Sequence, residues 1–380
     1  MANVLTDLAA DIYKAADVVG RETVGFIPSS TINGDGVQRV AKGDTVRAHF
    51  TRASNASDIT ESMTIPEGTD QEVDSKTLSI TKSRSVPIPM TGEDIKHLDN
   101  GVGYSTVYGD QIAQAMRTLT NEVETDLAVA AYKGASRAVG AAGTTPFGSN
   151  FDVIAEARQI LVDNGCPTND GRISMVLGTT AGTKMRNLAN LQQANTSGSD
   201  VMLRQGVLLD LQGLMMKESG FVQAHTKGGG TSYQSNGAKS SGAGTITLDS
   251  GSGTILAGDV VTFAGDSNKY VVNTALSGGD IVLGTPGLQA ALSDNVALTV
   301  GGNFTANVAF HQSALELAIR APAVPGGEDA ALDSMIVQDP HSGLVFELRV
   351  YKGYRKQMIE VAAAWGVKAW KPDNITLLLG

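Results

Sequence analysis

The chain has 380 residues, of which 42% are hydrophobic and 5% aromatic, and its formal net charge is −10. This length predicts two or three folded units with real cores, and the negative charge argues against a protein that grips nucleic-acid phosphates. The single cysteine, Cys166, excludes an intrachain disulfide, and we interpret it as a small apolar residue.

The first residues show no basic region followed by a long apolar run, so the sequence predicts no secretory signal. No stretch approaches the roughly 20 apolar residues that a membrane span needs. We therefore expect a soluble protein that is made in the cytoplasm and has no membrane partner.

Residues 1–43 are predicted to form an N-terminal arm. From Val4 to Val19 the apolar residues recur at helical spacing, and Gly20 would end this amphipathic helix. Residues 21–43 are polar and glycine-dotted, and we expect them to lie extended on another surface. An acidic stripe on the helix is formed by Asp7, Asp11 and Asp17. It is either a solvated face or a docking site for a basic partner.

Residues 44–90 alternate between apolar and polar side chains, which is the period of a β-strand. A turn signal from Pro66 to Asp70 divides the segment, so the simplest arrangement is a long two-stranded ribbon. Two strands bury too little apolar surface to be stable alone, so we expect a neighbouring subunit to stabilise the ribbon. The residues assigned to this subunit-contact loop are Met63, Ile65, Pro66, Glu67, Lys76 and Lys82.

Residues 91–150 are predicted to form a unit built on one long helix. Thr91 and Asp94 have the spacing of a helix cap. Residues 104–133 then carry apolar side chains every three or four positions, which predicts a spine helix roughly 40 Å long.

Residues 151–222 have the pattern of an α/β core. A helix from Phe151 to Asp163 is followed by a strand from Arg172 to Leu177 and a further helix. The stretch from Gly178 to Lys184 lies between this strand and helix. It lacks the glycine spacing and the ending of a phosphate-binding loop, so we interpret it as a turn.

Residues 223–302 change to a Gly-, Ser- and Thr-rich composition with few charges, which predicts an inserted small all-β domain. Its five expected strands are Thr245–Asp249, Asp259–Phe263, Lys269–Asn273, Asp280–Leu283 and Val296–Val300.

Residues 303–380 return to the earlier pattern, so we assign them with residues 151–222 to one interrupted core. The expected elements are a strand at Ala306–Phe310, a helix at Ser313–Ile319, and strands at Gly343–Tyr351 and Gln357–Trp370.

No catalytic or cofactor-binding pattern is found in the sequence. The five histidines have no partner at metal-ligand spacing, so we interpret each as a satisfied surface or core residue. There is no nucleophile elbow, and Cys166 has no histidine close in sequence. We therefore expect no enzyme activity, no cofactor and no metal.

The order of these elements resembles the coat proteins of P22-like tailed phages, a branch of the HK97-like major capsid proteins. The resemblance covers nearly the whole chain and is carried by the order of elements rather than by one motif. The stretches that carry it are Ile88–Ile95, Gly171–Leu177, Gly258–Gly265, Asn307–Ala318 and Tyr354–Trp370.

The resemblance implies an α+β, HK97-like capsid fold with an N-arm, an extended loop, a peripheral domain, an axial domain and an insertion domain. It implies self-association as hexamers and pentamers into an icosahedral head that encloses double-stranded DNA without sequence-specific binding. Further implied partners are a scaffolding protein, a portal and a decoration protein. The location is then the virion, after assembly in the host cytoplasm.

Three alternatives remain at this point. The inserted β-domain would also suit a surface-exposed, adhesin-like binding protein, although no signal sequence is predicted. Some HK97-like shells join a Lys to an Asn, and Lys76 and Lys82 lie in the predicted loop. An α/β enzyme would need convergent polar residues at strand ends, which the sequence does not show.

Overall fold

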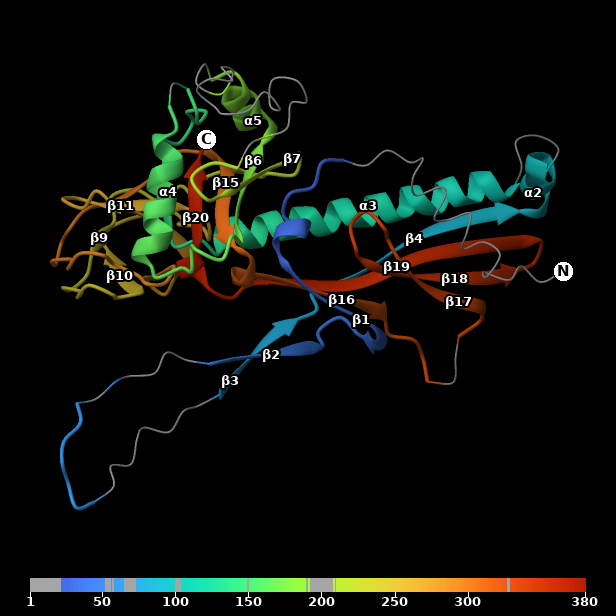
Figure 1. Ribbon diagram of the computed structural model, residues 1–380, viewed down its shortest axis with the longest axis horizontal. Coiled ribbons are helices and arrows are strands. Elements are labelled where there is room, and N and C mark those ends of the chain that lie inside the picture. The colour runs from blue at the N-terminus through green and yellow to red at the C-terminus, as the bar shows by residue number, and fades with distance from the viewer. Residues whose placement is uncertain are drawn as a thin grey trace.

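Figure 1 shows the chain as a computed structural model. The structure describes residues 22–51, 56, 58–64, 73–99, 104–148, 150–188, 191, 208, 210–326 and 329–380.

A six-stranded sheet under one long helix forms the first part of the body (Figure 1). Its strands in spatial order are β1 (Thr31–Val40), β16 (Leu315–Pro322), β19 (Lys356–Ala369), β18 (Val345–Gly353) and β17 (Ala331–Gln338), and β4 (Lys82–Thr91) also pairs with β19. Because β4 and β18 pair with the same residues of β19, they lie on opposite edges of that strand.

The spine helix α3 (Tyr104–Lys133) lies along one face of this sheet and has the predicted bounds. The side chains that it buries against the sheet repeat at three and four residues, as in Met116, Leu119, Val123 and Leu127. This apolar stripe is the reason that the segment forms a helix and packs on one side.

The short helix α2 (Gly92–Asp99) precedes α3 and begins with the predicted cap. The Asp94 N–H donates to Thr91 Oγ1 at 3.2 Å, and the Thr91 N–H donates to Asp94 Oδ2 at 3.0 Å. These reciprocal bonds satisfy two donors that a helix start leaves open.

A second sheet forms the other half of the body. Its core strands in spatial order are β7 (Met215–Ser219), β6 (Ile173–Gly178), β15 (Phe304–His311), β20 (Ile375–Leu379) and β5 (Arg137–Val139). Helices α4 (Asp152–Asp163) and α5 (Thr179–Arg186) contact this sheet, and short 3-10 turns lie at η1 (Ile27–Ser29), η2 (Gln312–Ala314) and η3 (Pro372–Asn374).

The inserted segment contains all five predicted strands. They are β10 (Thr245–Asp249), β11 (Val260–Phe263), β12 (Lys269–Ser277), β13 (Asp280–Leu283) and β14 (Leu298–Val300), with the short strands β8 (Ala224–His225) and β9 (Gln234–Ser235) before them. The insertion has its own apolar cluster around Val261, Phe263 and Tyr270. Its sheet is nevertheless continuous with the body, because β12 pairs with β5.

The predicted ribbon is present as a two-stranded hairpin of β2 (Thr45–Thr51) and β3 (Val73–Ser79). The predicted range of 44–90 was too long. Residues 82–91 form β4, which pairs with β19 in the body instead of continuing the hairpin. The cause is that Val86, Ile88 and Met90 pack against the core under α3.

Two further expectations were wrong. The segment predicted as a helix at Ser313–Ile319 is a turn followed by strand β16, because its apolar residues Leu315, Leu317 and Ile319 alternate with period two. Residues 22–43 do not lie wholly on another surface. Phe26 and Ile27 are buried in the core of their own chain, and β1 pairs in parallel with β16.

One buried carboxylate holds the start of the described chain to the spine helix. Glu124 lies within α3 and is fully buried. Its Oε1 accepts hydrogen bonds from the N–H groups of Gly25 and Phe26 at 2.6 and 2.8 Å, and its Oε2 accepts one from Ile27 at 2.9 Å. Ser219, at the end of β7, donates from Oγ to Glu124 Oε1 at 2.8 Å.

The backbone at Gly25 must approach closely for this contact to form. A Cβ at this position would lie 2.7 Å from a Val176 methyl group of β6. Phe26 then stacks on Phe310 of β15, with ring centroids 5.9 Å apart. One turn of chain is therefore fixed by a carboxylate from the helix and by packing against the second sheet.

Among the residues that the structure describes, the helices include none with the length and apolar character needed to cross a membrane.

Replacing Glu124 by Ala should lower the free energy of unfolding by about 3 kcal/mol, because three buried N–H groups and the Ser219 hydroxyl lose their acceptor. The matched control is Glu122→Ala on the same helix, whose carboxylate makes a partly exposed ion pair with Arg84 at 3.4 Å. That control should cost about 0.5 kcal/mol. Urea unfolding followed by circular dichroism measures both, and equal losses would contradict the role of Glu124.

Candidate assembly site

Among the described residues, the β2–β3 hairpin contacts the body at its base. Leu78 and Ile80 are buried there against Val40, Ala318 and Ala364. Backbone hydrogen bonds also hold the base. The Ile80 N–H donates to the Asp44 carbonyl at 2.8 Å, which joins the two ends of the hairpin, and the Thr81 N–H donates to the Trp365 carbonyl of β19 at 3.0 Å. The base is therefore a fixed part of the fold.

Beyond its base the hairpin projects away from both sheets (Figure 1). Its two strands form a separate two-stranded sheet, paired from Thr45 opposite Ser79 to Thr51 opposite Val73. Two apolar side chains beyond β2, Ile59 and Met63, are 99% and 106% exposed. A projecting hairpin with uncovered apolar side chains is suited to contact with another molecule.

The predicted contact residues do not all lie in this projection. Met63 does, and Lys76 lies in β3 opposite Ala48. Ile65, Pro66 and Glu67 fall outside the described residues, so their assignment stays a prediction.

Lys82 belongs to the body and not to the loop. Its Nζ donates to Asp126 Oδ1 of α3 at 2.8 Å and lies 5.9 Å from the centre of the Trp365 ring. Asp126 Oδ2 accepts a second bond from Trp365 Nε1 at 2.8 Å. The Lys82 amine therefore joins β4 to the spine helix within the same chain.

Ile59 was missed in the sequence because it is a single apolar residue among polar neighbours. No period marks it as part of a strand. The acidic stripe of Asp7, Asp11 and Asp17 lies outside the described residues, so its role as a scaffold contact also stays a prediction.

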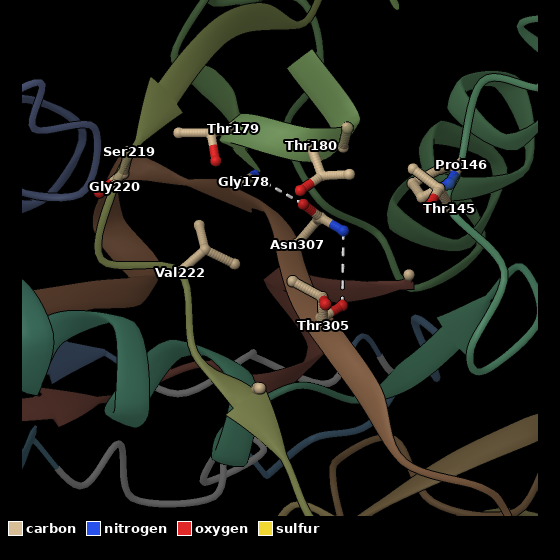
Figure 2. Close-up of a pocket in the computed structure, with 13 residues that line it drawn as sticks. Thr145, Pro146, Gly178, Thr179, Thr180, Ser219, Gly220, Val222, Thr305 and Asn307 are labelled. Carbon is tan, nitrogen blue, oxygen red and sulfur yellow. Dashed lines mark hydrogen bonds between the residues drawn. The ribbon is translucent and has the colours of Figure 1, made fainter. Parts of the chain in front are cut away.

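The prediction of a turn at Gly178–Lys184 was wrong, because only Gly178 precedes helix α5 and the residues from Thr179 onward are helical. The Gly178 N–H donates to Asn307 Oδ1 at 2.7 Å, and α5 begins at the next residue. Figure 2 shows the adjoining pocket of about 240 Å³, which is lined by backbone, by small side chains and by the hydroxyls of Thr179 and Thr180. None of its 13 lining residues has an ionisable side chain, so no side chain there supplies a positive charge for a phosphate.

Two histidines are buried among the residues whose burial the structure describes, and both have polar partners, as predicted. His225 Nε2 lies 2.7 Å from Asp259 Oδ1 where the chain enters the insertion. The same carboxylate accepts bonds from the N–H groups of Gly228 and Leu256 at 3.1 and 2.7 Å. This pair fixes the entry to the β-domain.

His311 forms a serine–histidine–aspartate set that the sequence did not reveal, because Asp170 is 141 residues away. His311 Nε2 lies 2.8 Å from Asp170 Oδ2, and Nδ1 lies 2.8 Å from Ser313 Oγ. The Ser313 N–H also donates to Nδ1, at 3.2 Å. The Ser313 hydroxyl and the Ser313 N–H thus both contact His311 Nδ1, so the His311 side chain caps the start of the turn η2.

Cys166 is buried, and burial raises the pKa of its thiol to about 11, with the carboxylates of Asp170 and Asp373 acting in the same direction. A raised pKa disfavours the nucleophilic thiolate. Among the described residues there is also no group of three His, Cys, Asp or Glu side chains placed to hold a metal ion.

The similarity of this chain to known proteins lies in its fold and not in its sequence. No protein-family model matches the sequence. The search of curated protein sequences also finds no match. Among solved structures, a chain of the capsid of Cyanophage P-SCSP1u is similar at 12% identity with a TM-score of 0.51, over 95% of this chain and 89% of that one.

A chain from Mycobacterium phage Che8 is similar at 14% identity with a TM-score of 0.50, over 95% of this chain and 92% of that one. These likenesses are too distant in sequence to show more than the fold. The chain has the α+β, HK97-like fold of phage capsid proteins, as the order of its elements indicated.

Replacing Ile59 and Met63 together by Ser should leave the unfolding midpoint unchanged, because both side chains are fully exposed. The same change should reduce association between copies, measured by light scattering against concentration. Thr60→Ala with Thr64→Ala alters two exposed neighbours and is the matched control. Unchanged association in the Ser variant would show that these apolar side chains contact nothing.

Cys166 in the folded protein should react with iodoacetamide at pH 8 about 100-fold more slowly than in the urea-unfolded chain, because its raised pKa leaves little thiolate. Mass spectrometry of the alkylated protein over time measures both rates. Equal rates would mean that the thiol is accessible and ordinary.

Proposed function

We propose that this chain is a major capsid protein of a tailed phage, a structural subunit rather than an enzyme. The observation that carries the proposal is an HK97-like fold whose likeness to a phage capsid chain spans 95% of the sequence. The projecting hairpin supports it independently, because its exposed apolar side chains require a neighbour that a single copy does not provide.

Self-association follows from the same features. Many copies would form hexamers and pentamers of an icosahedral shell, with the hairpin of each copy lying on an adjacent one. Ile59, Met63, Ile65, Pro66, Glu67 and Lys76 are the proposed contacts of this loop. Burial of the hairpin in the shell would tie its stability to assembly.

The charge of the chain suits a container for DNA. A net charge of −10 repels the duplex instead of binding it, so packaged DNA can slide along the wall. This is the physical basis for proposing enclosure of double-stranded DNA without sequence-specific contact.

The finer assignments are part of the proposal. They are the P22-like branch, a scaffolding protein that contacts Asp7, Asp11 and Asp17 of the arm, a portal and a decoration protein as further partners, and assembly in the host cytoplasm before residence in the virion. The support for them is the order of the elements and the insertion at residues 223–302.

Electron microscopy of the purified protein, alone and co-expressed with its neighbouring phage genes, tests the proposal. We expect closed shells or tubes tens of nanometres across, and light scattering from the same samples gives their mass. Monomers or small oligomers under every condition would contradict it.

A further inference from the structure

A polar pocket of about 300 Å³ lies between the body and the inserted β-domain. It is lined by residues of α4, of β5, and of β12 with the turn that precedes it. Strands β5 and β12 pair at this place, with Ala138 opposite Lys269, and α4 contacts β5. The pocket is therefore built from segments of both the body and the insertion.

The Arg137 side chain lines this pocket and is buried there. The residue is 6% exposed, its Nη1 donates to Asn268 Oδ1 at 3.3 Å, and its Nη2 donates to Asn164 Oδ1 at 2.9 Å. Its Nε is buried and has no hydrogen-bond partner. Both bonds end on neutral amide oxygens, so this positive charge has no counter-ion in contact among the described residues.

Several other arginines of the chain do have a counter-ion. Ion pairs with carboxylates are made by Arg39, Arg117, Arg186 and Arg349. Burial lowers the pKa of Arg137, and the more distant carboxylates of Asp163 and Asp266 oppose this effect only in part. A buried charge is costly unless it is paired, so an anion that reaches Arg137 is bound favourably.

A second positive charge lies in the same pocket. The Lys269 amine donates to the Gly140 carbonyl, and among the described residues no carboxylate makes an ion pair with it. An ammonium group has three N–H donors and a guanidinium has five, so both groups keep donors that the chain does not use. Charged donors of this kind form strong hydrogen bonds to carboxylate and phosphate groups.

We propose that this pocket binds one small oxyanion, such as inorganic phosphate or a carboxylate, between the guanidinium of Arg137 and the amine of Lys269. Ser267 and Asn268, in the turn before β12, line the same pocket and add neutral polar side chains. The inference is independent of the proposed function, because it concerns a ligand of the single chain and no contact between copies.

Two carboxylates of α4 restrict the ligand to a compact one. Glu156 and Asp163 also line the pocket, and both residues are exposed. Each repels further negative charge, so a long polyanion such as DNA is disfavoured at this place. The pocket therefore fits one anionic group and not a chain of them.

Equilibrium dialysis of the full-length chain against radiolabelled inorganic phosphate, with chloride added to a constant ionic strength, measures the binding. We expect one phosphate per chain, with a dissociation constant on the order of 1 mM. Arg137→Gln and Lys269→Gln should each weaken binding about 10-fold, because each removes a charged hydrogen-bond donor. Glu156→Gln should tighten binding about twofold, because it removes an exposed negative charge from the pocket.

The matched control is Lys227→Gln, which changes an exposed lysine outside the pocket and should leave binding unchanged. Lys269 is only half-buried, so Lys269→Gln decides the outcome if Arg137→Gln does not fold. The absence of saturable binding, or an equal loss in Lys269→Gln and Lys227→Gln, would overturn the proposal. Neither result bears on whether the chain forms particles, so the proposed function stands or fails separately.

Discussion

The acceptance of four hydrogen bonds by one buried carboxylate is the interaction on which the rest of this structure depends. Glu124 sits inside α3 and binds three successive backbone N–H groups of the chain and the hydroxyl of Ser219. A carboxylate is costly to bury unless its oxygens accept hydrogen bonds. The contact therefore forms only when α3, residues 25–27 and β7 are all folded against one another. This contact fixes the position of η1, and the chain then continues into β1, which pairs in parallel with β16.

Contacts within one chain hold the two sheets and the spine helix together, whereas the β2–β3 hairpin extends away from them. Asp126 joins α3 to β4 and β19, and Asp259 fixes the entry to the insertion. In contrast, among the described residues the strands β2 and β3 pair only with each other. The body is therefore stabilised within one copy, whereas the hairpin is the part that the proposed shell would cover.

Features with a strong local pattern could be predicted from the sequence. The period of α3, the cap at Thr91 and the five strands of the insertion are examples, since each depends on neighbouring residues. The helix predicted at Ser313–Ile319 failed because a short apolar run fits either period, and pairing with β19 decided for the strand. The contacts of Glu124 were not predictable, because a glutamate in a helix gives no sign of burial.

In the candidate assembly site, too, features with a local sequence pattern could be predicted and features set by distant residues could not. A two-stranded ribbon can be inferred from alternation and a turn signal, and that reasoning placed Met63 between its strands, where its role as a contact stays a prediction. Ile59 has no periodic neighbours, and the assignment of Lys82 failed because its partner Asp126 is 44 residues away.

Hydrogen–deuterium exchange of the free subunit and of assembled particles tests directly whether the body is stable in one copy and whether neighbouring copies cover the hairpin. Exchange at Gly25–Ile27 should be slow in both states, whereas exchange in β2 and β3 should be fast in the free subunit and slow in particles. Equal protection of β2 and β3 in the two states would contradict this coverage of the hairpin.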